Sequence, residues 1–486
     1  MTFARSSGIL LHPTSLPGRF GIGDLGRECF RFLDFLQEAR QKIWHVLPLG
    51  PTGPDHSPYQ CRSSIAGNPL LISLEKLVDE GYLQRRELQS APRFPASKIN
   101  FVAVQRYKIG IYRRAFAGFS QDPAYRAFEK RNAWWLNPYS EFMTLLEANR
   151  GASWTKFDPL IKAGDEAIRF HKFLQFEFFR QWQQVKVGCA RRNILVMGDM
   201  PFYVEHDSAD VWHSPRLFDL DTNGESRTVG GVPPDYFSED GQLWGNPTYR
   251  WATLKRTGYE WWVQRFRTAF ERVDVLRVDH FRGFVKYWSV HAGDSTARNG
   301  QWRKGPGIDL FRTVRRKLGD LCMVAENLGV ITPEVEKLRK RLGLPGMVVL
   351  QFAFAEDGTH RPNNYSRELV SFTGTHDNNT TRGWWNDLRR AAKSRSGSQA
   401  RRELARVKAF LQTDGREISW RFMQAVMASV ADVSMIPLQD VLQLGSEARM
   451  NIPGRAKGNW DWRYTPASLT PRIATQLRQL TEVTGR

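Results

Sequence analysis

Short runs of apolar residues alternate with longer amphipathic stretches along most of the chain. Each run ends in polar or glycine-rich residues, which is the pattern of βα units that build a parallel sheet. There are eight such runs, at residues 8–11, 43–49, 194–198, 273–278, 322–325, 347–353, 369–372 and 433–437. Eight buried strands in this order predict an α/β protein with a closed (β/α)8 barrel, a TIM barrel.

The spacing of the runs predicts insertions between the strands. The Trp- and Phe-rich stretch 134–187 separates the second run from the third, so we expect a mainly helical insertion at 70–190. A loop-rich insertion is expected at 201–270, where the Gly/Pro-rich stretch 229–247 would cover the barrel mouth, the place where barrels carry their chemistry. The sequence then predicts one catalytic barrel domain over 1–486, with the polar stretch 393–399 joining two surface helices.

Hydropathy and cysteine usage restrict the class of protein. The first apolar run covers only four residues before His12 and Pro13, too short for a secretory signal. No segment approaches the roughly 20 apolar residues that a membrane-spanning helix needs. The cysteines, Cys29, Cys61, Cys189 and Cys322, form no C-x-x-C pair, so neither a zinc ribbon nor a disulfide framework is indicated. We expect a cytoplasmic protein with no metal and no membrane partner.

The chain is strongly basic, with 70 Lys and Arg against 50 Asp and Glu and a net charge of +20. Such a charge attracts polyanions, so a non-catalytic polyanion-binding protein is one alternative. The excess is heaviest at 389–406, where basic residues alternate with Ala, Ser and Glu as on a solvated helix. Because no zinc-finger or RNP-like signature accompanies the charge, a basic surface is favoured over a specific nucleic-acid site.

Acidic residues follow the predicted strands. Arg277 and Asp279 stand two apart on one strand, so their side chains project from the same face. A guanidinium beside a carboxylate lowers the carboxyl pKa, which suits a nucleophile at neutral pH. The structural alternative is an ion pair that only holds the barrel mouth together.

Two further carboxyl groups occupy similar positions. Glu326 directly follows the run 322–325, where apolar neighbours would raise its pKa and let it donate a proton. Asp377, beside His376, follows the seventh run, although an Asp there could instead cap the next helix. One barrel brings these strand ends to the same opening. Two carboxylates about 5–5.5 Å apart would support retaining glycosyl transfer, and a larger separation would indicate inversion.

Aromatic residues in polar loops fit the same chemistry, because a sugar offers both an apolar face and hydroxyl groups. The candidates are Tyr59, Tyr236, Phe237 and Trp244, each of which could instead anchor its loop. The G-x-G-x-x-G pattern at 21–26 precedes a predicted helix at 27–39. The preceding strand ends ten residues earlier with two prolines between, so a dinucleotide site is not favoured.

The segments R-V-D-H-F-R-G (277–283), A-E-N-L-G (325–329) and G-T-H-D-N-N-T (374–380) resemble the active-site segments of the amylomaltases, the 4-α-glucanotransferases of glycoside hydrolase family 77 in the α-amylase-like clan. The resemblance runs nearly end to end. It also includes L-H-P-T-S-L-P-G (11–18), S-P-Y-Q (57–60), A-G-N-P (66–69), G-D-M-P (198–201), V-P-P-D-Y-F (232–237), W-G-N-P (244–247) and G-S-E-A-R-M-N-I-P-G (445–454).

The resemblance implies a role for individual residues. Asp279 would be the nucleophile and Glu326 the acid/base, while Asp377 with His376 would hold sugar hydroxyls at the cleavage point. Arg277 would keep Asp279 ionised. The residues implied to line the sugar sites are Tyr59, Asp199, Gln242, Trp244 and Asn451, and Asp235, Tyr236 and Phe237 would belong to a loop that overhangs the cleft. The family usually has Asp where this chain has Asn327 and Asn379.

The resemblance also implies the reaction. An α-1,4-glucan segment would pass from a donor maltooligosaccharide to the 4-hydroxyl of an acceptor glucan or glucose, with retention and without a cofactor. A hydrolase on the same barrel stays an alternative, because water and a sugar hydroxyl can attack the same intermediate. The family has no separate C-terminal β domain, and we expect a monomer or a weak homo-oligomer.

Overall fold

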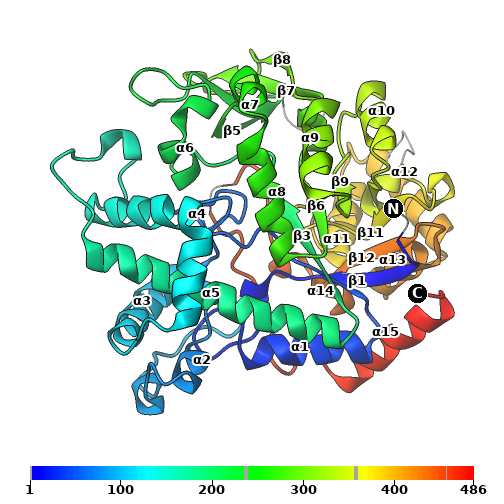
Figure 1. The fold of residues 1–486 in the computed structure, drawn as a ribbon. Coiled ribbons are helices and arrows are strands. Elements are labelled where there is room, and N and C mark those ends of the chain that lie inside the picture. The colour runs from blue at the N-terminus through cyan, green and yellow to red at the C-terminus, as the bar shows by residue number, and fades with distance from the viewer. Residues whose placement is uncertain (1–2, 235–238, 355–359, 456) are drawn as a thin grey trace.

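A parallel sheet of eight strands forms the centre of the molecule (Figure 1). The computed structural model describes residues 3–234, 239–354, 360–455 and 457–486. The strands, in spatial order, are β10 (Gly346–Val349), β11 (Leu369–Phe372), β12 (Val433–Pro437), β1 (Ser6–Leu10), β2 (Ile43–His45), β3 (Leu195–Met200), β6 (Val275–Val278) and β9 (Met323–Ala325). The Ala325 amide donates to the Pro345 carbonyl at 2.9 Å and brings the two ends of the sheet together. The predicted barrel of eight strands is confirmed.

The strand ends differ from the prediction in two places. The sixth run was expected to be a strand through residue 353, but β10 ends at Val349 and Leu350–Phe354 form a 3-10 helix, η7. The second run ends as a strand at His45, well before residue 49. In both segments most side chains stay buried after the strand has ended, although Phe352 is exposed. Burial alone therefore made these runs look longer than the ladder hydrogen bonds allow.

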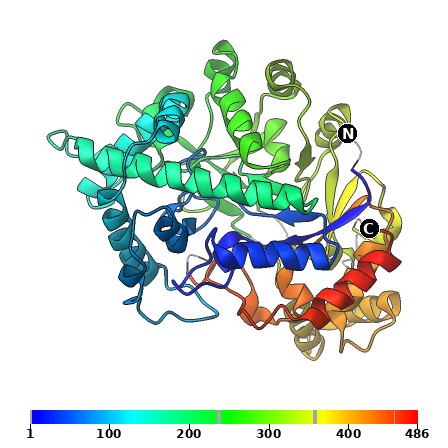
Figure 2. The same ribbon diagram turned by 60° about the horizontal axis from the view of Figure 1, so that its bottom comes forward.

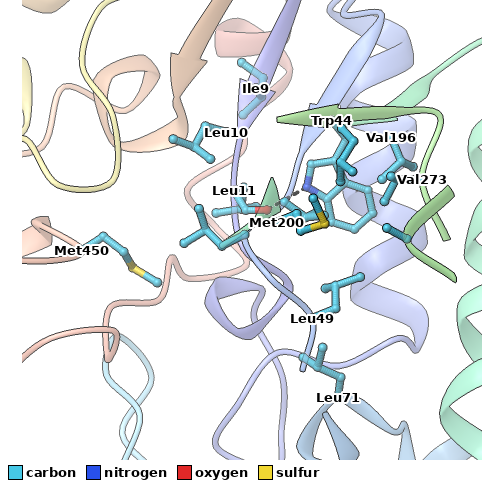
Figure 3. Close-up of a cluster of buried hydrophobic side chains, with 14 of the residues drawn as sticks. Ile9, Leu10, Leu11, Trp44, Leu49, Leu71, Val196, Met200, Val273 and Met450 are labelled. Carbon is cyan, nitrogen blue, oxygen red and sulfur yellow. Dashed lines mark hydrogen bonds between the residues drawn. The ribbon is translucent and has the colours of Figure 1, made fainter. Parts of the chain in front are cut away.

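Alternating apolar residues fill the barrel and cover its outer surface. The inward cluster takes residues from most strands: Ile43, Met197, Val275, Val324, Met347, Val349, Val370, Phe372, Val433 and Met435. Their neighbours along the strands point outward into the main core, where Trp44 packs among Ile9, Leu11 and Val196 (Figure 3). The Trp44 indole donates to the Leu11 carbonyl at 2.8 Å, so burying this ring leaves its N–H satisfied.

Helices pack around the sheet, and α1 (Arg27–Glu38), α5 (Asp165–Arg191) and α15 (Pro471–Val483) lie along one side of it (Figure 2). On α1, the buried residues Cys29, Phe32, Leu33 and Leu36 recur at the spacing of one helical face. The outer helices are α1 (Arg27–Glu38), α8 (Glu260–Arg272), α9 (Ile308–Leu318), α10 (Pro333–Arg341), α11 (Thr381–Ala392), α12 (Ser398–Leu411), α13 (Ile418–Ala428), α14 (Leu438–Val441) and α15 (Pro471–Val483). The stretch 393–399 joins α11 to α12, as predicted. Within the described segments, no helix is long and apolar enough to cross a membrane.

Between β2 and β3 the chain forms α2 (Leu74–Asp79), α3 (Phe101–Ala117), α4 (Pro123–Ala148) and α5 (Asp165–Arg191). Asp122 caps α4 and Pro123 occupies its first turn, which is the usual start of a helix. Helices α4 and α5 share an aromatic cluster, while Trp182 of α5 reaches the barrel and lies 6.2 Å from the Trp44 ring. We propose that 70–190 is an insertion of the barrel domain, because α5 belongs to both cores.

A second sheet lies beside the barrel (Figure 1). Its antiparallel strands, in spatial order, are β5 (Gln242–Pro247), β4 (Thr228–Val232), β7 (Lys286–His291) and β8 (Gln301–Lys304). The prediction of a loop at 229–247 was therefore wrong, since this stretch contributes two strands. Its glycines serve close packing: a Cβ on Gly230 would lie 2.4 Å from the Tyr203 ring. The helices α6 (Ala209–His213) and α7 (Trp251–Arg256) complete this region.

Candidate active site

Neighbouring strands β3 and β6 place Asp199 and Arg277 directly opposite each other in the parallel register. Arg277 Nη1 donates to Asp199 Oδ2 at 2.6 Å and to Asp279 Oδ1 at 2.9 Å. The Tyr59 hydroxyl also donates to Asp199 Oδ2, at 2.8 Å. Asp199 and Arg277 are buried, and the guanidinium joins Asp199 to Asp279, whose side chain is 27% exposed.

The two strand-end carboxyl groups, Asp279 and Glu326, follow β6 and β9, which pair in the barrel. The Asp279 amide donates to the Met200 carbonyl at 3.0 Å, and the Glu326 amide donates to the Val278 carbonyl at 3.0 Å. The Glu326 carboxylate accepts two backbone N–H groups, from His280 at Oε2 and from Leu328 at Oε1, both at 2.8 Å. These bonds fix the Glu326 side chain beside the segment that follows Asp279.

Burial dominates the titration of this pair. It raises the pKa of Asp279 to about 8, and the charges of Asp199, Glu326 and Asp377 act in the same direction, while Arg277 opposes them. Burial also raises the pKa of Glu326, against Arg277 and the two backbone donors. Arg277 lowers the pKa of Asp279, as the sequence predicted, but the expected net decrease is wrong because burial outweighs the ion pair. Burial therefore favours the protonated form of both carboxyl groups, and the loss of a proton from one affects the other.

Asp377 lies on the other side of the site, after β11, with its side chain 48% exposed. Its Oδ1 accepts the Asn451 amide at 2.6 Å and lies 3.5 Å from His376 Nε2. The alternative that Asp377 caps the following helix is wrong: the Thr380 hydroxyl caps α11 by accepting the Gly383 N–H at 3.0 Å. The Asp377 carboxylate is therefore not used in capping that helix.

Tyr59 connects the two sides. Its hydroxyl bonds to Asp199, and its ring stacks on the His376 imidazole with centroids 5.0 Å apart and planes 17° apart. His376 is buried, and burial lowers its pKa, with the Arg277 charge adding to the shift against the opposing effect of Asp377. A neutral imidazole results, which can donate one hydrogen bond and accept another.

Three histidines near these groups were missed by the sequence reasoning. His12 follows β1, and His45 is the last residue of β2. Burial lowers the pKa of His12 to about 3 and that of His45 well below its usual range. His45 Nε2 lies 3.9 Å from Asp199 Oδ2. His280 follows Asp279 with a left-handed φ of 48°. The signal for all three was their position at or just after a strand end, the same signal that identified the carboxylates.

The candidates on the antiparallel sheet lie close to His280. The Trp244 and His280 rings are nearly perpendicular with centroids 4.9 Å apart, and the Trp244 indole N–H donates to Gln242 Oε1 at 3.2 Å. Gln242 is exposed and Trp244 is partly buried. Three other candidates, Asp235, Tyr236 and Phe237, lie outside the described residues.

Asn327 and Asn379 both use their amides as donors to carboxylates or hydroxyls. Asn327 Nδ2 donates to Glu336 at 2.8 Å, and its Oδ1 accepts the Met347 amide at 2.7 Å. Asn379 Nδ2 donates to Asp387 at 2.8 Å and to Ser446 at 2.9 Å. An Asp at either position would set two carboxylates against each other. In the part of the chain that the structure describes, no cluster of His, Cys, Asp and Glu is arranged to hold a metal ion.

A parallel eight-stranded barrel that collects carboxyl groups at the carboxyl ends of its strands defines an enzyme of the TIM-barrel class. A family model described as 4-alpha-glucanotransferase matches residues 11–470, and the chain belongs to this family, glycoside hydrolase family 77.

Individual relatives agree with the family model. The chain is 46% identical to a 4-alpha-glucanotransferase of a Synechocystis species, over 99% of this chain and 98% of that protein. It is 45% identical to the 4-alpha-glucanotransferase of Thermus thermophilus, over 100% of both chains. These transferase names do not favour the hydrolase or the polyanion-binding alternative.

Solved structures give the same result for the fold. The structure superimposes on the amylomaltase from Streptococcus agalactiae in complex with acarbose with a TM-score of 0.93 and 33% identity, over 99% of both chains. It also superimposes on the amylomaltase from Corynebacterium glutamicum with a TM-score of 0.79, over 98% of this chain and 75% of that one. At 18% identity, that second likeness supports the fold alone.

Proposed function

We propose that the chain transfers α-1,4-glucan segments from a donor maltooligosaccharide or a starch- or glycogen-derived glucan to the 4-hydroxyl of an acceptor glucan or glucose, by a retaining double displacement. The observation that carries this proposal is the placement of Asp279 and Glu326 at the ends of neighbouring strands β6 and β9, where burial raises the pKa of both groups. Retaining glycosyl transfer needs one carboxylate and one carboxylic acid, which such a pair supplies.

In the first step the Asp279 carboxylate attacks the anomeric carbon of the donor. The glycosidic C–O bond breaks, and Glu326 gives its proton to the departing sugar oxygen. In the second step the Glu326 carboxylate takes the proton of the acceptor 4-hydroxyl. That oxygen attacks the anomeric carbon and displaces Asp279, so both carboxyl groups return to their starting states.

The other residues bind and orient the sugar in this proposal. Asp377 and His376 hold hydroxyls at the cleavage point, and Arg277 favours the ionised form of Asp279 against burial. Tyr59 stacks on His376 and bonds to Asp199, while Asn451, Gln242 and Trp244 line the sugar sites. The resemblance to the family also assigns Asp235, Tyr236 and Phe237 to the loop above the cleft.

We also propose that the enzyme works in the cytoplasm, without a cofactor, as a monomer or weak homo-oligomer. The four cysteines are free thiols in the structure, which suits a reducing compartment. Sedimentation at micromolar concentration tests the oligomeric state.

Incubation with maltotriose tests the function. Transfer of a maltosyl unit between two maltotriose molecules gives glucose and maltopentaose, and transfer of a glucosyl unit gives maltose and maltotetraose. Hydrolysis gives maltose and glucose in equal amounts and no product longer than maltotriose. The second result would rule out transfer as the main activity.

A further inference from the structure

The residues that follow Asp279 all contact the segment that carries Glu326. The His280 amide donates to Glu326 Oε2 at 2.8 Å, and the Phe281 amide donates to the Glu326 carbonyl at 3.2 Å. Farther along, Arg282 Nη1 donates to the Val330 carbonyl. We refer to residues 326–332 as the Glu326 loop. Three consecutive residues thus hold this loop at its start and near its middle.

Arg282 is fixed in turn by Trp302. The guanidinium carbon lies 4.0 Å from the centre of the indole ring, which is cation–π contact distance. Trp302 belongs to β8, the edge strand of the antiparallel sheet, and pairs across the strands with Trp288, whose ring centre is 5.1 Å away. Arg282 itself is buried, with 7% of its surface exposed.

The burial of Arg282 is not explained by a counter-ion. Within the described segments, no carboxylate lies at salt-bridge distance from Arg282, and its buried Nε has no hydrogen-bond partner. Burying a guanidinium in this way is costly for folding. Burial lowers the pKa of Arg282, and the negative charge of Glu326 opposes that shift, so the two groups interact at longer range. The contacts that remain are those to the Glu326 loop and to Trp302.

The opposite edge strand of the antiparallel sheet, β5, also contacts residues 280–282. Trp244 on β5 contacts the His280 ring, whereas Trp302 on β8 contacts Arg282. Because β5 and β8 are the two edges of one four-stranded sheet, the segment 280–282 is contacted at both ends by the same sheet.

We propose that Arg282 and Trp302 are positioning residues that hold the Glu326 loop where Glu326 can protonate the leaving oxygen. This inference rests on the proposed function, because it assumes that Glu326 is the acid. A displacement of a catalytic group by about 1 Å can cost about 10²-fold in rate. Loss of the contact between Arg282 and Trp302 should therefore slow the step that needs the proton and leave substrate binding nearly unchanged.

The test compares two donors. Maltotriose needs a proton on its leaving sugar, whereas α-maltosyl fluoride loses fluoride without one, so release of fluoride in a single turnover reports Asp279 alone. Trp302→Ala removes the stacking ring, and Arg282→Lys keeps the charge but loses the planar fork. We expect both variants to lower kcat on maltotriose by about 10- to 100-fold, with KM changed by less than about twofold and fluoride release by less than about threefold.

Two further variants control the experiment. Trp302→Phe keeps an aromatic ring under Arg282 and should restore kcat on maltotriose to within about threefold of wild type. Arg303→Ala removes the exposed neighbour on β8 and should leave both donors unaffected. Equal losses on the two donors, a loss confined to KM, or unchanged kcat in folded Arg282→Lys would overturn the inference. Failure of the wild type to make longer chains from maltotriose would instead overturn the proposed function.

Discussion

The two sides of the candidate site are built differently. On the β3, β6 and β9 side, Arg277 fixes Asp199, backbone N–H groups fix Glu326, and burial raises the pKa of Glu326. On the β11 side, Asp377 is half exposed and is contacted by a neutral amide and a neutral imidazole. The first side stabilises particular charges, while the second leaves a carboxylate with acceptor capacity for hydroxyl groups.

This difference assigns chemistry to one side and substrate orientation to the other. A nucleophile and an acid need controlled protonation, which requires low exposure and charged neighbours. A group that holds sugar hydroxyls needs free lone pairs and access, which Asp377 has. Substitutions on the first side should therefore change the chemical step most, and those on the second should have smaller effects that include binding.

The largest effect is expected from Asp279→Asn. The substitution keeps the shape of the side chain and removes the charge that attacks the anomeric carbon, so transfer from maltotriose should fall by about 10⁴- to 10⁶-fold. The Arg277 contact to Asp199 remains, and the fold should persist. Product formation by chromatography, with circular dichroism as a check on folding, measures both. Retention of more than about a tenth of wild-type transfer is incompatible with a nucleophilic Asp279.

Glu326→Gln should separate the two steps of the reaction. Natural glucans need a proton on the leaving sugar, so their turnover should fall by about 10³-fold or more, within the range for losing a general acid. α-Maltosyl fluoride should still load Asp279. Because the second step then lacks its base, a maltosyl adduct should accumulate, and intact-protein mass spectrometry with peptide mapping would locate it. Mapping of the adduct to Glu326 would reverse the assignment of the two carboxyl groups.

Asp377→Asn tests the exposed side. Hydrogen bonds to sugar hydroxyls that strengthen in the transition state supply several kcal/mol, so we expect kcat/KM on maltotriose to fall by about 10²- to 10³-fold. The loss should appear in both kcat and KM, unlike the loss in Asp279→Asn. Isothermal titration with a maltooligosaccharide would measure the binding part. A variant with unchanged KM and a nucleophile-like loss in kcat would end the distinction between the two sides.

The pH profile tests the titration of the buried pair. The raised pKa of Asp279, about 8, means that the pair keeps its proton until the solution becomes alkaline. As the pH rises through that value the proton is lost, Glu326 can no longer act as an acid, and kcat/KM should fall about tenfold per pH unit. Initial rates on maltotriose between pH 5 and 10 measure this. A fall that begins below pH 6 would show that the pair titrates like ordinary carboxyl groups.

Much of the site follows from the sequence because it depends on strand ends. The apolar runs before Glu326 and around Arg277 are local patterns, and a closed barrel brings their ends together whatever the loops do. The candidate positions at Asp279, Glu326 and Asp377 needed no knowledge of side-chain contacts. It was therefore predictable that the ends of their strands share one opening of the barrel.

The remainder depends on contacts between distant segments. Asp199 and Arg277 stand 78 residues apart, and only the register of β3 against β6 pairs them. The upward shift in the pKa of Asp279 comes from burial by other strands, which a neighbouring Arg in the sequence cannot reveal. The antiparallel sheet was missed because Gly230 and its neighbours are typical of a loop, although their small size serves packing against Tyr203.

The smallest effect is expected from Asn451→Ala, which removes the amide that donates to Asp377 at 2.6 Å. The Asn451 backbone N–H still donates to the His376 carbonyl at 3.1 Å, so the loop should keep its position. A hydrogen bond to a charged group contributes about 1.5–3 kcal/mol, and half exposure of Asp377 favours the lower end, so we expect a loss of about tenfold in kcat/KM.

The double variant with Asp377→Asn decides whether Asn451 acts through Asp377. If its amide only orients that carboxylate, the two losses should not add, because the second substitution removes a contact that the first has already weakened. Rates on maltotriose for the wild type, both single variants and the double variant complete the cycle. Full additivity would mean that Asn451 contacts the sugar independently, and a single-variant loss as large as that of Asp377→Asn would mean that the amide, and not the carboxylate, dominates the exposed side.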